Sequence, residues 1–543
     1  MTSELDPPLL ALDELVRRAT ARVRERDIGH DQLAAHGLAH LRMEVEACRQ
    51  LVAWASEGDE LEGRIAAAYA GELCRALVGG IDVGACESLA LADLGLADRD
   101  VEATLLAPEV RAMAQRYASG AALVELARDV AARGGAGPRL ADGALEATRA
   151  EMLRFAQREI APLARRIHRD DALIPLDLIE RLGRLGVFGL TTPESFGGGG
   201  QSRVAMCVVT EEIARASLGV GSLGTRSEIA AELVLTCGTD DQKRRLLPGI
   251  ASGAILPTAV FSEPDHGSDL AHVRTRAERQ PDGSWRLFGQ KTWITHATRA
   301  DLMTVLARTS RDDDGHGGLS MFLAPKSRAR DGRDFVDEGL TGTEIAVLGY
   351  RGMKEYELSF DGFRVEADGL LGGVEGSGFK QLMQTFETAR IQTAARAVGV
   401  AQAALDEAMR YARERRQFGQ PLIEFPRIAR KIGRAVVRVA AARSLTHFAA
   451  RTKDLGRRCD LEAGMAKLLA TRVAWETADA AVQIHGGNGY AEEFTVSRLL
   501  VDARVLSIFE GTSEIQAQVI ARRLLESPPA AEGAPEPSRG RDR

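Results

Sequence analysis

The chain has 543 residues, which is too many for one ordinary hydrophobic core, so several domains are expected. Apolar residues make up 45% and charged residues 27% of the sequence, the balance of a globular protein. The formal net charge of -7 argues against broad nucleic-acid binding, which requires a basic surface.

Membrane, export and metal signals are not found in the sequence. No run of about eighteen uncharged apolar residues occurs, and the acidic start MTSELDPPLL has neither the basic nor the apolar part of a signal peptide. The cysteines lack CxxC or Cys/His spacing, which indicates reduced thiols in a cytoplasmic protein and no metal site. They are Cys48, Cys74, Cys86, Cys207, Cys237 and Cys459.

Residues 1–135 are predicted to form a helical extension with short polar breaks. Apolar residues recur there at three- and four-residue steps, as on the buried face of a helix. One stripe contains Leu38, Leu41, Val45, Cys48 and Val52, and a second contains Leu61, Ile65, Ala68, Leu73 and Leu77. Breaks are expected at Gly79-Gly80 and at 134–138, the predicted linker. No motif in this extension carries chemistry, so a packing or oligomerisation module is expected.

The next two regions differ in their periodicity. Residues 140–254 continue as helices, interrupted by the glycine-rich turn TTPESFGGGG. Residues 255–370 contain a turn at Pro281-Asp282-Gly283 and short alternating runs, which predict an antiparallel β domain. These runs are SWRLFGQKTWIT, LMTVLAR, LSMFLA and YELSF.

Helical periodicity returns at 371–526, and the Pro- and charge-rich tail at 527–543 is predicted to be disordered. The chain shows no internal repeat, and neither a P-loop nor a GxGxxG motif follows a strand. The predicted order is therefore helical extension, helical domain, β domain and helical domain.

Five segments, in order, resemble signatures of the acyl-CoA dehydrogenase family. They are AVFSEPDHGSDL at 259–270, KTWIT at 291–295, RERRQFGQPL at 413–422, AVQIHGGNGY at 481–490 and IFEGTSEIQ at 508–516. The resemblance covers about residues 140–525 and implies a mostly α fold with an antiparallel β domain and a C-terminal four-helix bundle. It also implies an acyl-CoA substrate, electron-transfer flavoprotein as partner, and a homodimer or homotetramer with FAD at the subunit interface.

Glu510 is the predicted catalytic base. Removing a proton beside a thioester needs a carboxylate in a dry pocket, where desolvation increases its basicity. Glu510 lies in an apolar run and precedes Gly511, which lets a thioester approach the backbone. The resemblance assigns Glu510 as the base and its backbone N–H as a donor to the thioester carbonyl. Some relatives carry the base on an earlier helix, where this chain has Ala389. The alternative for Glu510 is a charge at a helix start.

The resemblance also implies a set of FAD contacts. A tryptophan in a strand is more often plain core, and glutamine is common at the position of Glu514, which weakens that assignment. Arg415 matches an arginine that binds the pyrophosphate of the neighbouring subunit's FAD, whereas Arg413 and Arg416 fit solvated helix positions better. The expected FAD contacts are Phe261, Ser262, Ser268, Trp293, Ile294, Thr295, Arg415, Gln417, Phe418, Gln483, Gly486, Gly487, Thr512 and Glu514.

The predicted substrate contacts include residues on the CoA arm and one on the acyl pocket. Ser268, Glu387 and Arg390 match positions near the pantetheine and nucleotide parts, and Gly511 faces the thioester. His485 is expected to be structural. His266 and His296 stand near the flavin segments, where the family commonly has small or amide residues.

Arg226 lies near the centre of the stretch 217–235, which is usually neutral in family members that act on plain fatty acyl chains. A buried guanidinium is costly unless it pairs with an anion, so Arg226 is expected to meet a carboxylate on the acyl chain. The alternative is a surface pair with Glu228 or Glu232.

The helical extension points to a particular reaction, because most members of the family begin near residue 140 of this chain. Members with such an extension oxidise (2S)-methylsuccinyl-CoA to mesaconyl-CoA in the ethylmalonyl-CoA pathway, and the resemblance implies this reaction. The alternatives are a neutral short or branched acyl-CoA substrate, an acyl-CoA oxidase, and a non-catalytic binding protein on the same fold.

Overall fold

The computed structural model describes residues 2–84, 87–134, 140–310, 313 and 315–526. Nearly all of the predicted linker at 134–138 and the whole predicted tail at 527–543 lie outside these residues. Within the described ranges, the helices are too short or too polar to cross a membrane.

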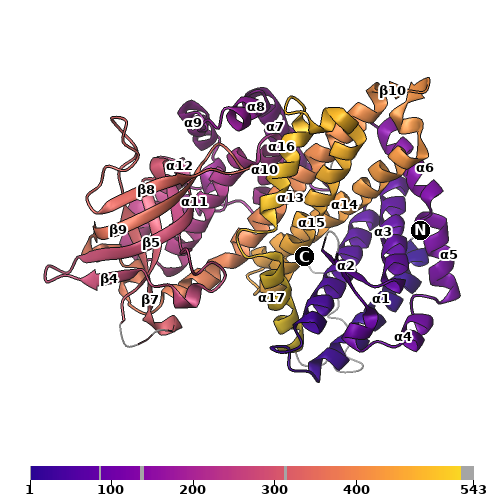
Figure 1. Cartoon of the computed structure of the whole chain (residues 1–543), viewed down its shortest axis with the longest axis horizontal. Helices are drawn as coiled ribbons and strands as arrows, with labels where there is room; N and C mark the ends of the chain where they lie inside the picture. Colours follow the sequence, from indigo (N-terminus) through magenta and orange to yellow (C-terminus); the bar gives the residue numbers. More distant parts are fainter. Residues whose placement is uncertain (1, 85–86, 135–139, 311–312, 314, 527–543) are drawn as a thin grey trace, which may run out of the picture.

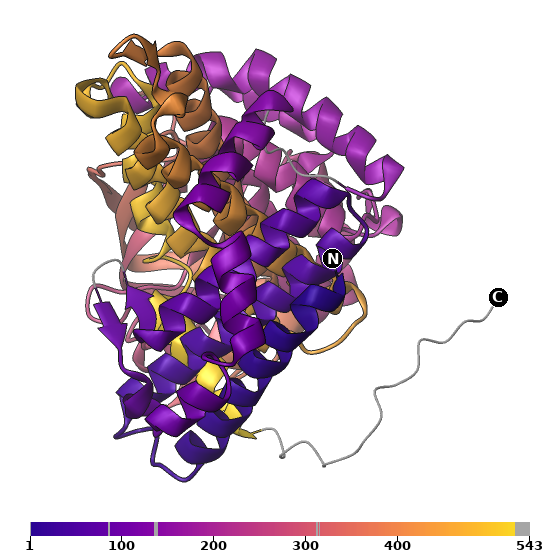
Figure 2. The same ribbon diagram turned by 90° about the vertical axis from the view of Figure 1, so that its right-hand side faces the viewer.

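The N-terminal extension consists mainly of helices packed beside the C-terminal part of the chain (Figures 1 and 2). The first predicted stripe lies on α2, where Leu38, Leu41, Val45 and Cys48 are buried. Asp59 caps α3, and the helix ends before the predicted break at Gly79-Gly80. The helices are α1 Thr2–Arg24, α2 Gln32–Ser56, α3 Glu60–Val78, α4 Asp98–Ala103, α5 Pro108–Tyr117 and α6 Gly120–Ala132.

The prediction of an all-helical extension is wrong at one place. Strands β1 Ile81–Gly84 and β2 Glu87–Leu89 pair in antiparallel fashion between α3 and α4. Each strand is too short for an alternating pattern to be recognised in the sequence, so only the break at the two glycines could be predicted.

The second region is helical, as predicted. Ser202 and Ser217 cap α10 and α11 through their side chains, and both helices bury most of their residues. A π-helical turn at Ala156–Ile160 connects α7 to α8. The helices are α7 Gly143–Phe155, α8 Ala161–Arg169, α9 Leu176–Arg184, α10 Arg203–Ala216, α11 Leu218–Cys237 and α12 Asp240–Ser252.

The β domain lies at one end of the molecule, on the left in Figure 1. The strands are β3 Pro257–Val260, β4 Arg276–Arg279, β5 Trp285–Thr295, β6 Leu302–Arg308, β7 Leu319–Pro325, β8 Leu340–Ile345 and β9 Glu355–Val365. The four predicted strand runs correspond to β5, β6, β7 and β9. The sheet order is β3-β6-β4-β5-β9-β8, with β7 beside β6. The predicted β domain is confirmed and most of its strand pairs are antiparallel, but β6 pairs with β3 and β4 in parallel, which was not predicted. Alternation shows which residues face the core but not which strands become neighbours.

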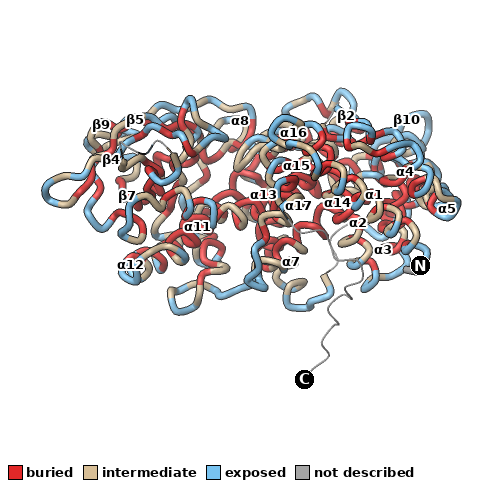
Figure 3. Tube along the Cα trace, turned by 90° about the horizontal axis from the view of Figure 1, so that it is seen from below, coloured by how far each residue is buried: buried red, intermediate tan, exposed pale blue. Residues whose placement is uncertain are grey.

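The C-terminal helices form the centre of the molecule, where the buried segments concentrate (Figure 3). Helices α13 Gly378–Glu414, α14 Pro426–Asp454, α15 Asp460–His485 and α16 Thr495–Leu506 pack together as the bundle. Helix α17 Ser513–Glu526 follows the segment that contains Glu510. A small hairpin of β10 Arg416–Gln417 and β11 Gln420–Pro421 connects α13 to α14.

The extension packs on this bundle through a buried charged cluster. Helix α2 contacts α14, α15 and α17. Glu44 of α2 is buried and accepts a hydrogen bond from the hydroxyl of Tyr69. Its carboxylate also pairs with Arg438 of α14, at 2.9 Å, and with Arg472 of α15. The extension therefore supplies the counter-charge for two arginines of the bundle.

We predict that Glu44→Ala destabilises the protein by about 3–5 kcal/mol, because it leaves two buried guanidinium groups without this carboxylate. The measurement is the free energy of unfolding in urea. Glu125→Ala, at an exposed position of α6, is the control and should change the free energy by about 0.5 kcal/mol or less. Equal effects of the two substitutions would contradict a stabilising role of this contact.

Candidate active site

Glu510 lies in the turn before α17, and its carboxylate meets side chains from two other helices. Oε1 is 2.5 Å from Nη2 of Arg226 on α11. Oε2 accepts hydrogen bonds from Nη2 of Arg396, at 2.8 Å, and from the hydroxyl of Thr393, both on α13. The Glu510 side chain is only 12% exposed. The predicted base is therefore enclosed where α11, α13 and the start of α17 meet.

The surroundings of Glu510 have opposing effects on its pKa. Burial disfavours the charged form, but Arg396, Arg226 and the hydrogen bond from Thr393 stabilise it more strongly. The net result is a pKa below the ordinary value of a glutamate. In this arrangement Glu510 is ionised and ready to accept a proton, but it is a weaker base than an isolated buried carboxylate.

The backbone around Glu510 is held in an unusual shape. Glu510 has φ 53° and Gly511 has φ 86°, so two consecutive residues lie in the left-handed region. The φ of Gly511 is one that L side chains rarely adopt, which favours glycine there, and a Cβ would also displace Nε2 of Gln516, 2.4 Å away. Nζ of Lys467 on α15 donates to the Gly511 carbonyl at 2.5 Å, and Gln516 donates to the same oxygen at 3.1 Å.

Lys467 was not predicted as a site residue. It is fully buried, and burial lowers the pKa of its ammonium group to about 7. In a sequence, a single lysine in an alanine-rich helix has the appearance of a solvated surface residue. Only the packing of α15 against the turn at Gly511 reveals its position.

The surface alternative for Arg226 is wrong. Its guanidinium is buried and pairs with Glu510 instead of either neighbour on α11. The carboxylate of Glu228 accepts from Thr191, and burial raises its pKa to about 7. Glu232 lies 3.3 Å from Lys453. The direct contact between Arg226 and the predicted base was not anticipated, since 284 positions separate them in the sequence.

Three of the predicted FAD residues lie at the end of β5. A register shift between Lys291 and Ile294 marks a bulge in the pairing with β9. Trp293 has φ 59° at this bulge and its side chain is 59% exposed, whereas Ile294 and Thr295 are buried. Bulges commonly re-aim a side chain in this way. The sequence could not distinguish a core tryptophan from an exposed one, and the structure shows an exposed indole.

Two buried pairs of side chains, neither of them predicted from the sequence, support this end of the sheet. Nζ of Lys291 lies 3.0 Å from Glu263 and donates to the carbonyl of Phe261, while the N–H of Thr292 donates to the carbonyl of Ser262. The segment of Phe261 and Ser262 is thereby fixed beside β5.

Glu355 of β9 faces Thr295 across the sheet. The Thr295 hydroxyl lies 2.9 and 3.0 Å from the two carboxyl oxygens of Glu355. Burial raises the pKa of Glu355 to about 8, so this group is largely protonated at neutral pH. The pairs Lys291–Glu263 and Thr295–Glu355 could not be recognised as sequence motifs, because each joins residues from different strands or loops.

A second group of predicted FAD residues meets in a pocket of about 290 Å³. Arg415, Gln417, Gly486 and Gly487 line it, together with Tyr411 and His485, whose rings stack at 4.0 Å. Gly486 has φ 61°, and a Cβ on either glycine would meet no atom within 4 Å. The loop of Gly486 and Gly487 therefore exposes its backbone beside the guanidinium group of Arg415.

The remaining predicted contacts are dispersed. Phe418 is 93% exposed at the tip of the β10–β11 hairpin, and Ser268, Gln483 and Glu514 are also exposed. Thr512 accepts from the N–H of Ile515 at the start of α17.

Two of the three residues assigned to the CoA arm, Glu387 and Arg390, lie together near the start of α15. Arg390 is buried against the ring of Phe386, and Glu387 pairs with Lys453 at 2.8 Å and accepts from the N–H of Cys459. Glu387 is therefore committed to an ion pair within the chain.

The histidines differ in their surroundings. His485 donates from Nδ1 to the carbonyl of Ala481. His296 is buried, and neither of its ring nitrogens has a partner among the described residues. Burial lowers the pKa of His296 to about 3, so this ring is neutral. Nε2 of His266 also has no partner.

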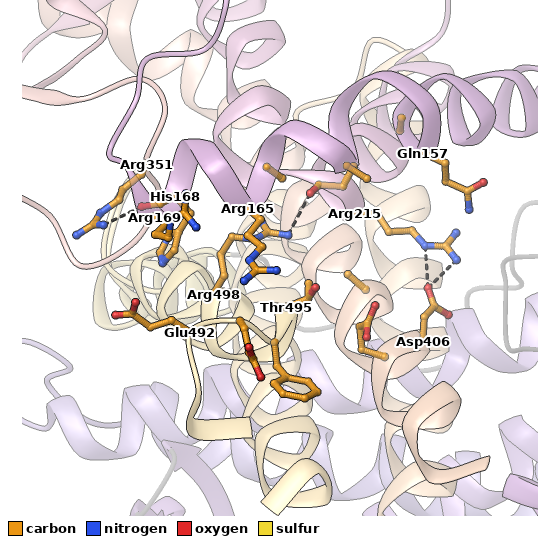
Figure 4. Close-up of a pocket in the computed structure, with 18 of the residues that line it drawn as sticks. Gln157, Arg165, His168, Arg169, Arg215, Arg351, Asp406, Glu492, Thr495 and Arg498 are labelled. Atoms are coloured by element: carbon orange, nitrogen blue, oxygen red, sulfur yellow. Dashed lines mark hydrogen bonds and ion pairs between the residues drawn. The ribbon is translucent and has the colours of Figure 1, made fainter. Parts of the chain in front are cut away.

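A separate cavity of about 320 Å³ opens between α8, α10, α13 and the start of α16 (Figure 4). Five arginines and five carboxylates line it, so it has no net charge that would favour a charged ligand. Arg215 is engaged with Asp406 and Glu212 in this cavity. None of the predicted site residues lines it, and we assign it no part in the chemistry.

The two groups of residues fit the FAD that the sequence implies. The exposed indole of Trp293 beside Thr295 offers a flat wall and hydrogen-bonding groups for a fused ring. The pocket of Arg415 and the open glycine loop offers a forked cation and backbone for a pyrophosphate-containing arm. These features belong to different parts of the chain, since β5 and β10 lie at opposite ends in Figure 1.

Comparison with known proteins identifies the class. Models of the acyl-CoA dehydrogenase N-terminal, middle and C-terminal domains match residues 143–254, 258–363 and 376–525. The chain belongs to the acyl-CoA dehydrogenase family and is an FAD-dependent oxidoreductase.

One relative matches the extension as well. (2S)-Methylsuccinyl-CoA dehydrogenase of Cereibacter sphaeroides is 52% identical over 542 residues, covering 97% of this chain and 98% of that protein. Butyryl-CoA dehydrogenase from Megasphaera elsdenii has a TM-score of 0.67 at 32% identity and covers 72% of this chain and 100% of its own. A glutaryl-coenzyme A dehydrogenase in complex with glutaryl-CoA has the same TM-score and identity, covering 72% and 97%.

We predict that Lys467→Met lowers kcat by about tenfold to a hundredfold, because the turn at Gly511 loses the donor that fixes Glu510. The variant should also lose the part of the pH dependence of the unfolding free energy that comes from titration of Lys467. The folded-state pKa of about 7 lies below the ordinary 10.5, so between these values the unfolded chain binds more protons and wild-type stability rises with pH. The slope is at most about 1.4 kcal/mol per pH unit.

The measurement is urea unfolding of both proteins at pH 7 and pH 9, together with steady-state kinetics. Flavin content, determined by absorbance, controls for loss of cofactor. An unchanged kcat, or the same pH slope in both proteins, would show that Lys467 does not hold the turn as described.

Proposed function

We propose that the chain oxidises a short, branched dicarboxylic thioester, (2S)-methylsuccinyl-CoA, to mesaconyl-CoA. The observation that carries this proposal is Arg226, a buried guanidinium in direct contact with Glu510. A neutral acyl chain gives such a cation no partner, whereas a carboxylate on the chain gives it one.

The comparisons support this choice of substrate. The relative with 52% identity carries the name of this activity and shares the N-terminal extension. The glutaryl-coenzyme A dehydrogenase of similar fold was solved with the thioester of another dicarboxylic acid.

The proposed mechanism follows from the positions of the chain's own groups. Glu510 accepts the proton from the carbon next to the thioester carbonyl, while a hydrogen leaves the adjacent carbon with its electron pair. Bound FAD would supply the acceptor for that hydride. The N–H of Glu510 stabilises the charge that develops on the thioester oxygen, and Lys467 holds the neighbouring carbonyl away from it. The proposed electron acceptor is an electron-transfer flavoprotein. We also propose a cytoplasmic location, with which the free thiols of the described cysteines are consistent.

We further propose that the enzyme is a homodimer or homotetramer in which two subunits share each FAD. The groups at Trp293 and at Arg415 lie at opposite ends of one chain (Figure 1). Two such chains side by side bring one group from each to the same cofactor. Arg415 and the glycine loop of one subunit then bind the pyrophosphate and adenosine of its partner's FAD.

We predict that Glu510→Gln abolishes bleaching of the flavin by methylsuccinyl-CoA, with a loss of about a thousandfold or more in rate. The amide keeps the shape of the side chain but accepts no proton. The measurement is anaerobic stopped-flow absorbance on protein with a checked FAD content. Wild type should be bleached far faster by methylsuccinyl-CoA than by 2-methylbutanoyl-CoA.

Glu387→Gln tests the nearest rival carboxylate on α13. Because Glu387 is paired with Lys453, its variant should still be bleached. Bleaching of Glu510→Gln within a few-fold of wild type would reject the assigned base. A wild type that is bleached better by the neutral thioester would reject the proposed substrate.

We predict that Arg415→Ala lowers the FAD-to-protein ratio and weakens subunit assembly together, because one side chain serves both. Loss of a charge-assisted contact to phosphate corresponds to about tenfold or more in FAD affinity. The measurements are absorbance and light scattering. Arg413→Ala is the matched control, since Arg413 is exposed two residues earlier and does not line this pocket. A fully loaded, fully assembled Arg415→Ala protein would contradict cofactor sharing through this residue.

A further inference from the structure

Arg226 joins the proposed substrate-recognition group to the proposed base. Its Nη2 lies 2.5 Å from Oε1 of Glu510, while its Nε is buried and has no hydrogen-bond partner among the described residues. One edge of the guanidinium therefore contacts the base, and a second donor on the same group is unused.

The hydroxyl of Tyr350 is a second unused donor beside Arg226. Tyr350 is 4% exposed, and its hydroxyl is buried without a partner among the described residues. The residue has φ 59°, its N–H donates to Asp502 at 2.7 Å, and its ring packs edge-on against Phe509 at 5.4 Å. Its position is thus fixed next to the turn of Glu510. Arg226 contacts the carboxylate of this same turn.

The charged groups around Glu510 come from every helix packed against it. Arg226 lies on α11, Arg396 on α13 and Lys467 on α15. Arg226 in turn interacts with Glu355 of β9, whose raised pKa keeps it largely neutral. Glu510 is therefore the main anion facing these cations. Its pKa stays low as long as Arg226 pairs with no second anion.

We infer that the distal carboxylate of the substrate activates Glu510 by binding to Nε–H of Arg226 and to the hydroxyl of Tyr350. Such a carboxylate divides the charge of Arg226 between two anions and places a negative charge near Glu510. Both effects raise the pKa of Glu510 and so increase its strength as a base. This inference rests on the proposed function, since it requires a dicarboxylic thioester.

The consequence is that the enzyme discriminates between dicarboxylic and neutral thioesters at the proton-transfer step as well as in binding. A neutral thioester of the same shape can occupy the acyl pocket, but it leaves Arg226 fully charged and Glu510 weak. The substrate's carboxylate thus contributes an interaction that changes the reactivity of the enzyme, which raises kcat rather than only lowering KM.

The test separates proton removal from oxidation. In the flavin-reduced holoenzyme, hydride transfer is blocked, but the α-proton of a bound thioester can still exchange with solvent. The experiment measures deuterium incorporation at the α-carbon in D2O by NMR, across a range of pH and at saturating thioester. The two probes are methylsuccinyl-CoA and 2-methylbutanoyl-CoA, in which a methyl group replaces the distal carboxylate.

In the wild type, the acid limb of exchange should lie at higher pH with methylsuccinyl-CoA than with 2-methylbutanoyl-CoA. The plateau rate should also be about tenfold or more higher with the dicarboxylic thioester. Arg226→Leu should shift the acid limb for the neutral thioester upward and increase its plateau by about tenfold, because Glu510 loses one of its cations.

Tyr350→Phe provides a second variant in case Arg226→Leu does not fold. It should move the profile of methylsuccinyl-CoA toward that of the neutral thioester, and this shift should be larger than any shift of the neutral profile. Tyr356→Phe is the matched control, because its hydroxyl lies 3.1 Å from Thr298, and it should leave both profiles at wild-type values.

The outcomes distinguish the inference from the proposed function. Coincident wild-type profiles, with Arg226→Leu raising only the KM for methylsuccinyl-CoA, would overturn base activation and keep the substrate assignment. Slower exchange of the neutral thioester in a folded Arg226→Leu protein would also overturn it. Failure of methylsuccinyl-CoA to bind or to bleach the oxidised wild type would instead reject the proposed substrate.

Discussion

The structure depends on placing a carboxylate and two guanidinium groups together away from water. Glu510, Arg226 and Arg396 come from three elements that are distant in sequence, and each is buried. Any one of these charges would be costly to bury alone, but together they satisfy one another. The packing of α11 and α13 therefore has to be accurate to hydrogen-bond distances, which explains the small, closely packed residues along both helices. Thr393 donates to Glu510, and Ser222 accepts a hydrogen bond from Arg396.

The helices and most of the long strands could be predicted, because each has a local pattern. The stripe on α2, the strand at β5 and the break after α3 all follow from periodicity within a few residues. Pairing between elements could not be predicted in the same way. The parallel contacts of β6 and the β1–β2 hairpin depend on neighbours brought together by the fold. The packing of α2 on α14 and α17 likewise depends on a charge match that is visible only in three dimensions.

The candidate site shows the same limit. Glu510, Arg226 and Arg415 were predicted from the segments around them, but their mutual arrangement was not. Arg396, Lys467, Glu355 and Tyr350 carry no local signal, because a polar residue in a helix or strand usually indicates a solvated surface. Their roles appear only when the structure shows buried polar atoms and their partners. For Arg226 the sequence left open a carboxylate on the acyl chain or a surface pair with Glu228 or Glu232, and the structure shows a pair with Glu510, 284 positions away.

The extension is connected to the active site through the same helices that hold Glu510. Helix α17 begins three residues after Glu510 and packs on α2, and α15 carries both Lys467 beneath the turn and Arg472 against Glu44. Helix α2 therefore packs on both of the helices that flank the turn of the proposed base. Burial of the extension and geometry of the base are thus connected through these helices, although no residue of the extension contacts the carboxylate of Glu510 among the described residues.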